Sequence, residues 1–106
     1  MTRAFPAVGH RYLVDFVAFR VELEFTSDTS LTYYNVDANG KITGSETVTI
    51  KVEPITEHIF LVTWQETDKT TVVHIEDYSK HTIVTNITSP PDLTFDQFHG
   101  TFKKVS

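Results

Sequence analysis

The sequence contains no cysteine. A disulfide framework, a thiolate nucleophile, an iron–sulfur cluster and a cysteine-based zinc site are therefore excluded. It also lacks any run of about 18 apolar residues, the length that a transmembrane helix requires, and its first residues do not resemble a signal peptide. We therefore expect a soluble, cytoplasmic protein that does not associate with membranes.

Positive charge is also scarce, with 9 Lys and Arg against 14 Asp and Glu and a formal net charge of −5. The basic residues are spread singly apart from Lys103 and Lys104, so nucleic-acid binding is not expected. Glycine and proline are few, four of each, and 40% of the residues are hydrophobic, which is ordinary for a packed globular chain. A length of 106 residues suffices for one core, and we predict a single domain over residues 1–106.

The sequence does show an alternation of apolar and polar residues with a period of two, broken by turn residues about every 8 to 12 positions. This pattern predicts eight strands, at residues 11–16, 19–25, 31–36, 46–53, 58–65, 70–77, 81–87 and 95–105. The connections are mostly short and polar, so neighbouring strands should pair as hairpins. We predict an all-β fold, an eight-stranded antiparallel up-and-down barrel, with a two-sheet sandwich as the alternative.

The alternation also predicts which faces meet the core. Apolar and charged residues alternate along 19–25, so one face is buried and the other meets water. In strand 70–77 the same rule predicts Val73 and Ile75 as core residues and leaves the face of His74 open. Strand 58–65 is apolar on both faces, so its outer face should be covered by a partner subunit or by the N-terminal segment.

A barrel of eight strands can be filled by its own side chains or can hold one small ligand. Trp64 and Glu66 share one face of their strand, so an inward Trp64 places the carboxylate at the barrel mouth. Apolar surroundings there would raise its pKa, although a rim glutamate in water is the commoner case. Glu46 continues another buried stripe and is a second candidate. Exactly one of Tyr33 and Tyr34 can line the interior.

Signals for cofactors are missing from the sequence. There is no nucleophile elbow, phosphate loop or dinucleotide fingerprint, so no cofactor is expected. Five histidines are present, but none has the spacing of a metal site, so no metal is expected. A structural, hydrogen-bonded role for His74 is favoured over a catalytic one.

Three segments resemble a known family. They are residues 60–66 (FLVTWQE), residues 70–77 (TTVVHIED) and the terminal Gly-Thr-Phe at 100–102. Together they resemble the MoaF-like family, named after molybdenum cofactor biosynthesis protein F, and the resemblance extends from Gly9 to Val105. It implies a calycin barrel related to lipocalins, which binds a small molecule and is linked to a cofactor pathway.

The same layout is similar to that of phenolic acid decarboxylases, small dimeric barrels with a Trp-x-Glu on the corresponding strand. Glu66 matches their catalytic glutamate. Their tyrosine pair falls on Val14 and Phe16 here, and residues 40–46 supply no arginine. Lys41 is not an equivalent, because an ammonium lacks the planar fork that binds a carboxylate with two hydrogen bonds. Decarboxylation by that mechanism is therefore not favoured.

We predict a calycin-like homodimeric barrel that binds a small, largely apolar or aromatic ligand. The candidate ligand-binding residues are Trp64, Tyr33, Phe60, Glu46 and His74, and Glu66 is the orienting and candidate catalytic group. One alternative is a lyase acting on small aromatic acids with Glu66 as acid and base. The other is a filled barrel that binds another protein through its apolar outer strand, and a cavity above about 300 Å³ would count against it.

Overall fold

Between residues 5 and 106, the part of the chain that the computed structural model describes, every regular element is a β-strand. No helix that could cross a membrane is present in this range. The strands are, in chain order, β1 (Arg11–Asp15), β2 (Arg20–Phe25), β3 (Ser30–Val36), β4 (Ile42–Thr49), β5 (Lys51–Pro54), β6 (Ile59–Gln65), β7 (Thr71–Asp77), β8 (Thr82–Ser89) and β9 (Thr94–Lys104). The predicted all-β class is confirmed.

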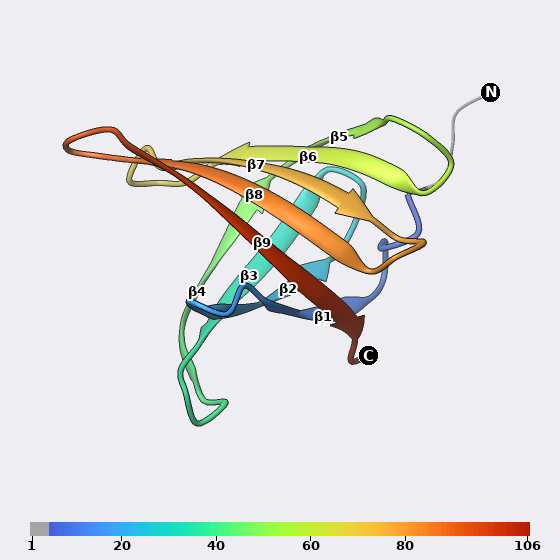
Figure 1. The fold of residues 1–106 in the computed structure, drawn as a ribbon, viewed down its shortest axis with the longest axis horizontal. Coiled ribbons are helices and arrows are strands. Elements are labelled where there is room, and N and C mark those ends of the chain that lie inside the picture. Colours follow the sequence, from blue (N-terminus) through green and yellow to red (C-terminus); the bar gives the residue numbers. More distant parts are fainter. Residues whose placement is uncertain (1–4) are drawn as a thin grey trace.

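All strands belong to one antiparallel sheet, in the order β4-β3-β2-β1-β9-β8-β7-β6-β5. The two edge strands of this order, β4 and β5, follow one another in the chain with only Ile50 between them. The sheet therefore curls round until its edges meet, and it forms a nearly closed barrel (Figure 1). The up-and-down barrel is confirmed, with the predicted strand 46–53 divided between β4 and β5, so that nine strands replace eight.

The bend at Ile50 lets one stretch of chain pair with both edges of the sheet. Thr49 pairs with Ser30 of β3, and Lys51 pairs with Thr63 of β6. Ile50 itself is 1% exposed, and its backbone N–H donates to the carbonyl of Thr29 at 2.9 Å. A buried side chain and a backbone hydrogen bond thus hold the corner. Before the bend, β4 turns away from β6, and this part of the seam has no backbone ladder.

One end of the barrel is closed by aromatic rings, the aromatic plug. Its members are Phe5, Tyr12, Phe25, Phe60, Tyr78 and Phe102. The Phe5 ring lies 5.1 Å edge-on from Phe25 and 5.2 Å from Phe60, an arrangement that aromatic quadrupoles favour. Phe5 therefore enters the barrel end rather than covering the outer face of β6. Residues 1–4 lie outside the described part of the chain.

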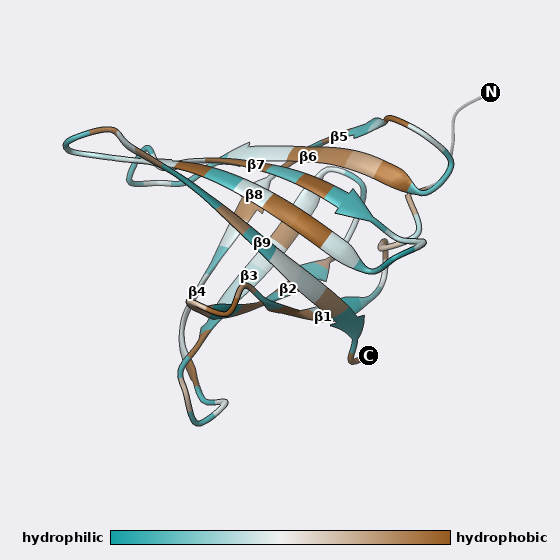
Figure 2. Cartoon of the chain, viewed as in Figure 1, coloured by the Kyte–Doolittle hydropathy of each residue, from teal (hydrophilic) through white to brown (hydrophobic). Residues whose placement is uncertain are grey.

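The burial pattern of β7 differs from the prediction. Val72, His74 and Glu76 face the interior, at 4%, 3% and 1% exposure, while Ile75 is 43% exposed. The prediction that Val73 and Ile75 face the core was therefore wrong. Apolar residues occupy both faces of this strand, so period-two hydropathy alone does not decide its register. Figure 2 shows how apolar colour is concentrated on the neighbouring strands β6 and β8.

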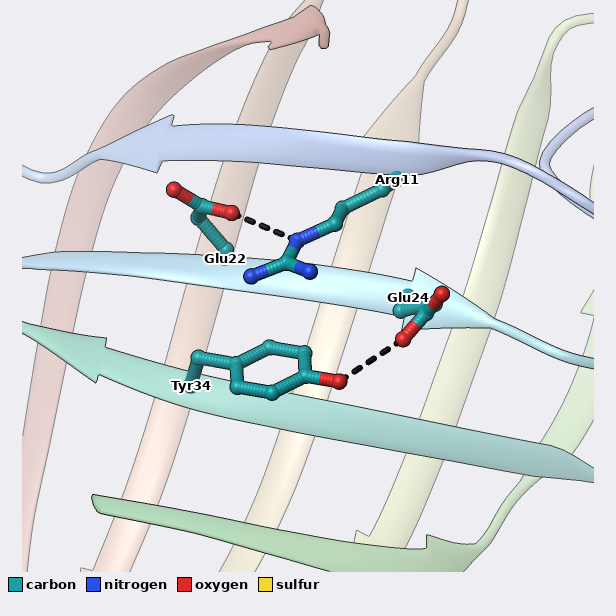
Figure 3. A network of polar contacts seen from close by, with 4 residues as sticks. All are labelled: Arg11, Glu22, Glu24 and Tyr34. Atoms are coloured by element: carbon teal, nitrogen blue, oxygen red, sulfur yellow. Dashed lines mark hydrogen bonds and ion pairs between the residues drawn. The ribbon is translucent and has the colours of Figure 1, made fainter. Parts of the chain in front are cut away.

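The outer face of β1 to β3 is polar, as Figure 3 shows. Arg11 Nε donates to Glu22 Oε1 at 2.6 Å, and its guanidinium lies 4.0 Å from the centroid of the Tyr34 ring. The Tyr34 hydroxyl donates to Glu24 at 2.8 Å. This cluster places Tyr34 outside the barrel, so its neighbour Tyr33 is the tyrosine that points inward.

Two isoleucines on neighbouring strands test the assignment of faces. Ile83 on β8 is 2% exposed and Ile75 on β7 is 43% exposed. We expect Ile83→Ala to lower the free energy of unfolding by about 3 kcal/mol, because it leaves a cavity in the core. Ile75→Ala should cost less than about 1 kcal/mol. Urea denaturation of both variants measures this, and equal losses would contradict the assignment.

Candidate functional site

An internal cavity of about 220 Å³ lies at the end of the barrel opposite the aromatic plug. Its apolar lining consists of Phe16, Phe19, Val21, Leu23, Trp64, Val72 and Ile87. Its polar lining consists of Tyr33, Asn35, Glu66, Thr70, His74 and Thr85. Larger hollows, such as one of about 740 Å³ beside residues 26–29 and β5, are formed largely by loops and strand ends on the surface. The interior cavity is therefore the candidate site.

Trp64 and Glu66 reach the cavity from the end of β6. Because they are two residues apart, they share the inward face, and Trp64 Nε1 donates to Glu66 Oε2 at 3.1 Å. A tight turn follows, in which the Lys69 N–H donates to the Glu66 carbonyl at 2.9 Å. Burial is the main cause that raises the pKa of Glu66, and the negative charges of Asp68 and Glu46 raise it further. The hydrogen bond from Trp64 and the nearby Tyr33 hydroxyl oppose this shift.

Tyr33 faces Trp64 across the cavity from β3. The two rings are nearly parallel, 22° apart, with centroids separated by 6.4 Å. The Tyr33 hydroxyl donates to Glu46 Oε1 at 2.8 Å. Burial raises the pKa of Tyr33, and the hydrogen bond to the Glu46 carboxylate adds to the shift. Tyr33 is thus held as a neutral hydroxyl with its proton directed at Glu46.

Glu46 spans the seam between β4 and the turn that follows β6. Its Oε2 accepts hydrogen bonds from the backbone N–H of Thr67, at 2.9 Å, and from the Thr67 hydroxyl. These bonds, the hydroxyl first, hold the pKa of Glu46 below its ordinary value. Although we predicted a pocket role, Glu46 is not part of the cavity lining. In this structure its hydrogen bonds join the two sides of the barrel where the backbone ladder is missing.

A buried polar pair lies deeper in the barrel on β7. His74 Nδ1 lies 2.9 Å from Glu76 Oε2, and the Tyr78 hydroxyl donates to Glu76 Oε1 at 2.7 Å. Both carboxylate oxygens therefore have donors, which is the condition for burying such a group. Burial, together with the Glu76 carboxylate, raises the pKa of Tyr78. The pairing occupies Nδ1 and leaves Nε2 as the ring nitrogen available on the side of the cavity.

Thr85 supplies a buried hydroxyl to the cavity wall. It lies on β8 directly opposite His74 in the strand register and is 0% exposed. Its Oγ1 has no hydrogen-bond partner among residues 5–106. A buried hydroxyl without a partner is rare in folded proteins, because it loses its hydrogen bonds to water without replacement. Thr85 Oγ1 is thus a group that an occupant of the cavity would satisfy.

The structure brings together only some of the residues that the sequence singled out. Trp64, Tyr33, His74 and Glu66 surround one cavity, whereas Phe60 belongs to the aromatic plug at the other end. Sequence reasoning missed Thr85, although its parity with Ile83 and Ile87 on β8 places it inward. Glu76 was missed because a charged side chain is normally assigned to the outer face. Within residues 5–106 no three His, Asp or Glu side chains are grouped as metal ligands.

Comparison with known proteins identifies a family and a structurally similar protein. The sequence model of the family described as MoaF-like matches residues 8–103. A crystal structure of a proposed beta-lactamase from Burkholderia vietnamiensis is similar to this chain, with a TM-score of 0.86 and 26% sequence identity. The likeness covers 98% of this chain and 100% of that one. None of the curated proteins matches the sequence.

The raised pKa of Glu66 predicts a pH-dependent stability difference. The folded state binds the Glu66 proton more tightly than the unfolded state does. Protonated Glu66 therefore stabilises the fold at low pH, and this stabilisation is lost as pH rises through the folded-state pKa. Glu66→Gln should therefore match the wild type in mild acid and exceed it in free energy of unfolding at neutral pH. Urea denaturation at both pH values measures the difference.

The matched control is Glu57→Gln, since Glu57 is an exposed carboxylate in the bend between β5 and β6. It makes the same change of charge outside the cavity and should show no such gain at neutral pH. A Glu66→Gln protein that is less stable than the wild type at neutral pH would contradict the assignment.

Proposed function

Because the chain belongs to the MoaF-like family, we propose that it is a small-molecule-binding barrel whose cavity takes a compact, largely apolar ring compound. The observation that carries the proposal is an interior cavity with apolar walls and a few polar groups directed at one space. This combination is typical of ligand sites, in which apolar area supplies affinity and a few polar atoms fix orientation.

The size of the cavity fits a single ring. An apolar cavity of about 150 Å³ holds benzene, and the cavity here measures about 220 Å³, so one ring with a small substituent fits. A cavity above roughly 300 Å³ would by itself count against a ligand-free interaction module. The volume here is smaller, so it does not decide between the two functions. The argument for a ligand therefore depends on the lining as well as on the volume.

The polar lining favours a ligand over an empty barrel. Thr85 Oγ1 is buried without a partner among the described residues, and the pairing of His74 with Glu76 leaves Nε2 available. If no occupant were bound, Thr85 Oγ1 would carry an uncompensated desolvation cost. A ligand that contacts this wall relieves that cost, whereas binding another protein on the outer surface does not.

Hydrolysis, which the description of the Burkholderia vietnamiensis protein suggests, has less support in this chain. An activated hydroxyl nucleophile needs a base within hydrogen-bond reach. Thr85 Oγ1 has no such partner among the residues described. The Tyr33 hydroxyl does meet the Glu46 carboxylate at 2.8 Å, but the raised pKa of Tyr33 disfavours the phenolate. We therefore propose binding rather than hydrolysis as the function.

Titration with toluene tests the proposal, with Trp64 fluorescence as the readout. We expect saturable quenching, because Trp64 lines the cavity and is the single tryptophan of the chain. Val72→Phe should abolish the saturation, since Val72 also lines the cavity and a larger side chain would fill it. Val73→Phe, on the outward face of the same strand, is the matched control and should bind as the wild type does. A linear, non-saturating response of the wild type would contradict the proposal.

We also propose that two copies associate through the outer face of β6 to β8. Leu61, Ile75 and Val84 are directly aligned across these strands. The row is flanked by Glu53 on β5 and His99 on β9. A two-fold axis parallel to the strands would superpose the apolar rows and bring each Glu53 opposite the partner's His99. The pairing of a carboxylate with an imidazole that can donate a hydrogen bond to it favours a second copy as the occupant of the face.

Sedimentation velocity tests this association. We expect the wild type to sediment as a dimer and Ile75→Lys as a monomer, because an ammonium would be buried in the middle of the interface. Leu93→Lys replaces another exposed apolar residue, 69% exposed in the β8–β9 connection, and should stay dimeric. A wild type that remains monomeric at high protein concentration would contradict the proposal.

A further inference from the structure

Three groups of the cavity offer hydrogen-bond acceptors, on Glu66, Tyr33 and His74, beside the Thr70 and Thr85 hydroxyls and the Asn35 amide, which can also donate. Glu66 accepts one bond from Trp64 Nε1 at 3.1 Å, and a carboxylate can accept about four. The Tyr33 proton is directed at Glu46, which leaves the phenolic oxygen to accept. His74 Nδ1 lies against Glu76, so Nε2 is the ring nitrogen that remains for a ligand, and it accepts a hydrogen bond in the tautomer that has its proton on Nδ1. A ligand would therefore satisfy these three groups best by donating hydrogen bonds.

The charges around the cavity have one sign. No Lys or Arg is among its lining residues, and the charged neighbours that act on Glu66 are the carboxylates Asp68 and Glu46. Lys69, in the turn beside Glu66, is exposed. An anion entering this space thus meets negative charge without a compensating cation.

The titratable side chains around His74 come from several strands. They are Glu66 at the end of β6, Tyr33 on β3 and Glu76 on β7. The two carboxyl groups of this set, Glu66 and Glu76, add negative charge and none of the three adds positive charge.

The walls supply the remaining part of the recognition. Trp64 forms one side of the cavity, with Tyr33 stacked at 22° and the His74 ring edge-on at 4.7 Å. Aromatic faces attract cations and pack well against another ring. Aromatic walls, acceptor atoms and negative charge at the mouth are complementary to one kind of small molecule.

We propose that the cavity selects a single-ring aromatic amine, with its nitrogen donating to Glu66 and its ring against Trp64, and rejects aromatic carboxylates. The inference deepens the proposed binding function and depends on it. It also separates this chain from a lyase of aromatic acids, since a carboxylate substrate needs a cation that this cavity does not supply.

Three probes of similar size test the inference by calorimetry or Trp64 fluorescence at neutral pH: toluene, benzylamine and benzoate. We expect benzylamine, as its ammonium ion, to bind about ten-fold or more tightly than toluene, because a hydrogen bond to a charged group is added. Benzoate should bind at least about ten-fold more weakly than toluene. Benzoate binding as tightly as toluene would overturn the inference while leaving the proposed function in place. If none of the three binds, the proposed function fails and the inference with it.

Glu66→Gln isolates the group that carries the selectivity. Trp64 Nε1 retains an acceptor in the variant, so the fold and toluene affinity should be preserved. The preference for benzylamine over toluene should fall about ten-fold. Glu57→Gln, which removes an exposed carboxylate outside both the cavity and the proposed dimer face, should retain the preference. Equal preferences in the two variants would show that general negative charge, rather than Glu66, attracts the amine, and would overturn the assignment.

Discussion

The barrel depends on one stretch of chain that must pair with both edges of its sheet. β4 and β5 lie at opposite ends of the strand order, yet only Ile50 separates them. A barrel removes its edges by closure, and here the closure is made by a bend rather than by a ladder along the whole seam. Once Ile50 is fixed in the core, β3 and β6 are brought round to the same stretch of chain. This closure of the sheet sets which ends of the strands surround the interior.

Much of this fold follows from period-two alternation, and the exceptions have physical reasons. Strand 20–25 alternates cleanly, so its buried residues Val21, Leu23 and Phe25 are predicted correctly from the sequence. β7 has apolar residues on both faces, and its inward face carries His74 and Glu76. A hydropathy pattern assigns such residues to solvent, because it takes no account of the hydrogen bond by which two polar side chains can be buried together. The bend at Ile50 was missed for a related reason, since the alternation continues through it without a break.

The polar groups inside the barrel are costly for stability and therefore informative about function. Glu76 is 1% exposed and is tolerated because His74 and Tyr78 donate to its two oxygens. A well-packed apolar substitute for such a buried pair is often as stable. What the pair provides is an imidazole held in one orientation beside the cavity. Thr85, opposite His74 in register, adds a hydroxyl that the folded chain leaves without a partner among its described residues.

The closure of the barrel and the chemistry of its mouth share the same side chains. Glu46 bridges the seam to Thr67, and its other oxygen accepts the Tyr33 proton. Tyr33 is thereby fixed against Trp64, which donates to Glu66. Because Glu46 is fully engaged in closing the seam, Glu66 is the carboxylate that remains to face a ligand. Glu46 and Asp68 add negative potential at the mouth, and no Lys or Arg in the cavity lining balances it. The same constraint that closes this sheet thus favours a mouth that accepts hydrogen bonds and disfavours anions.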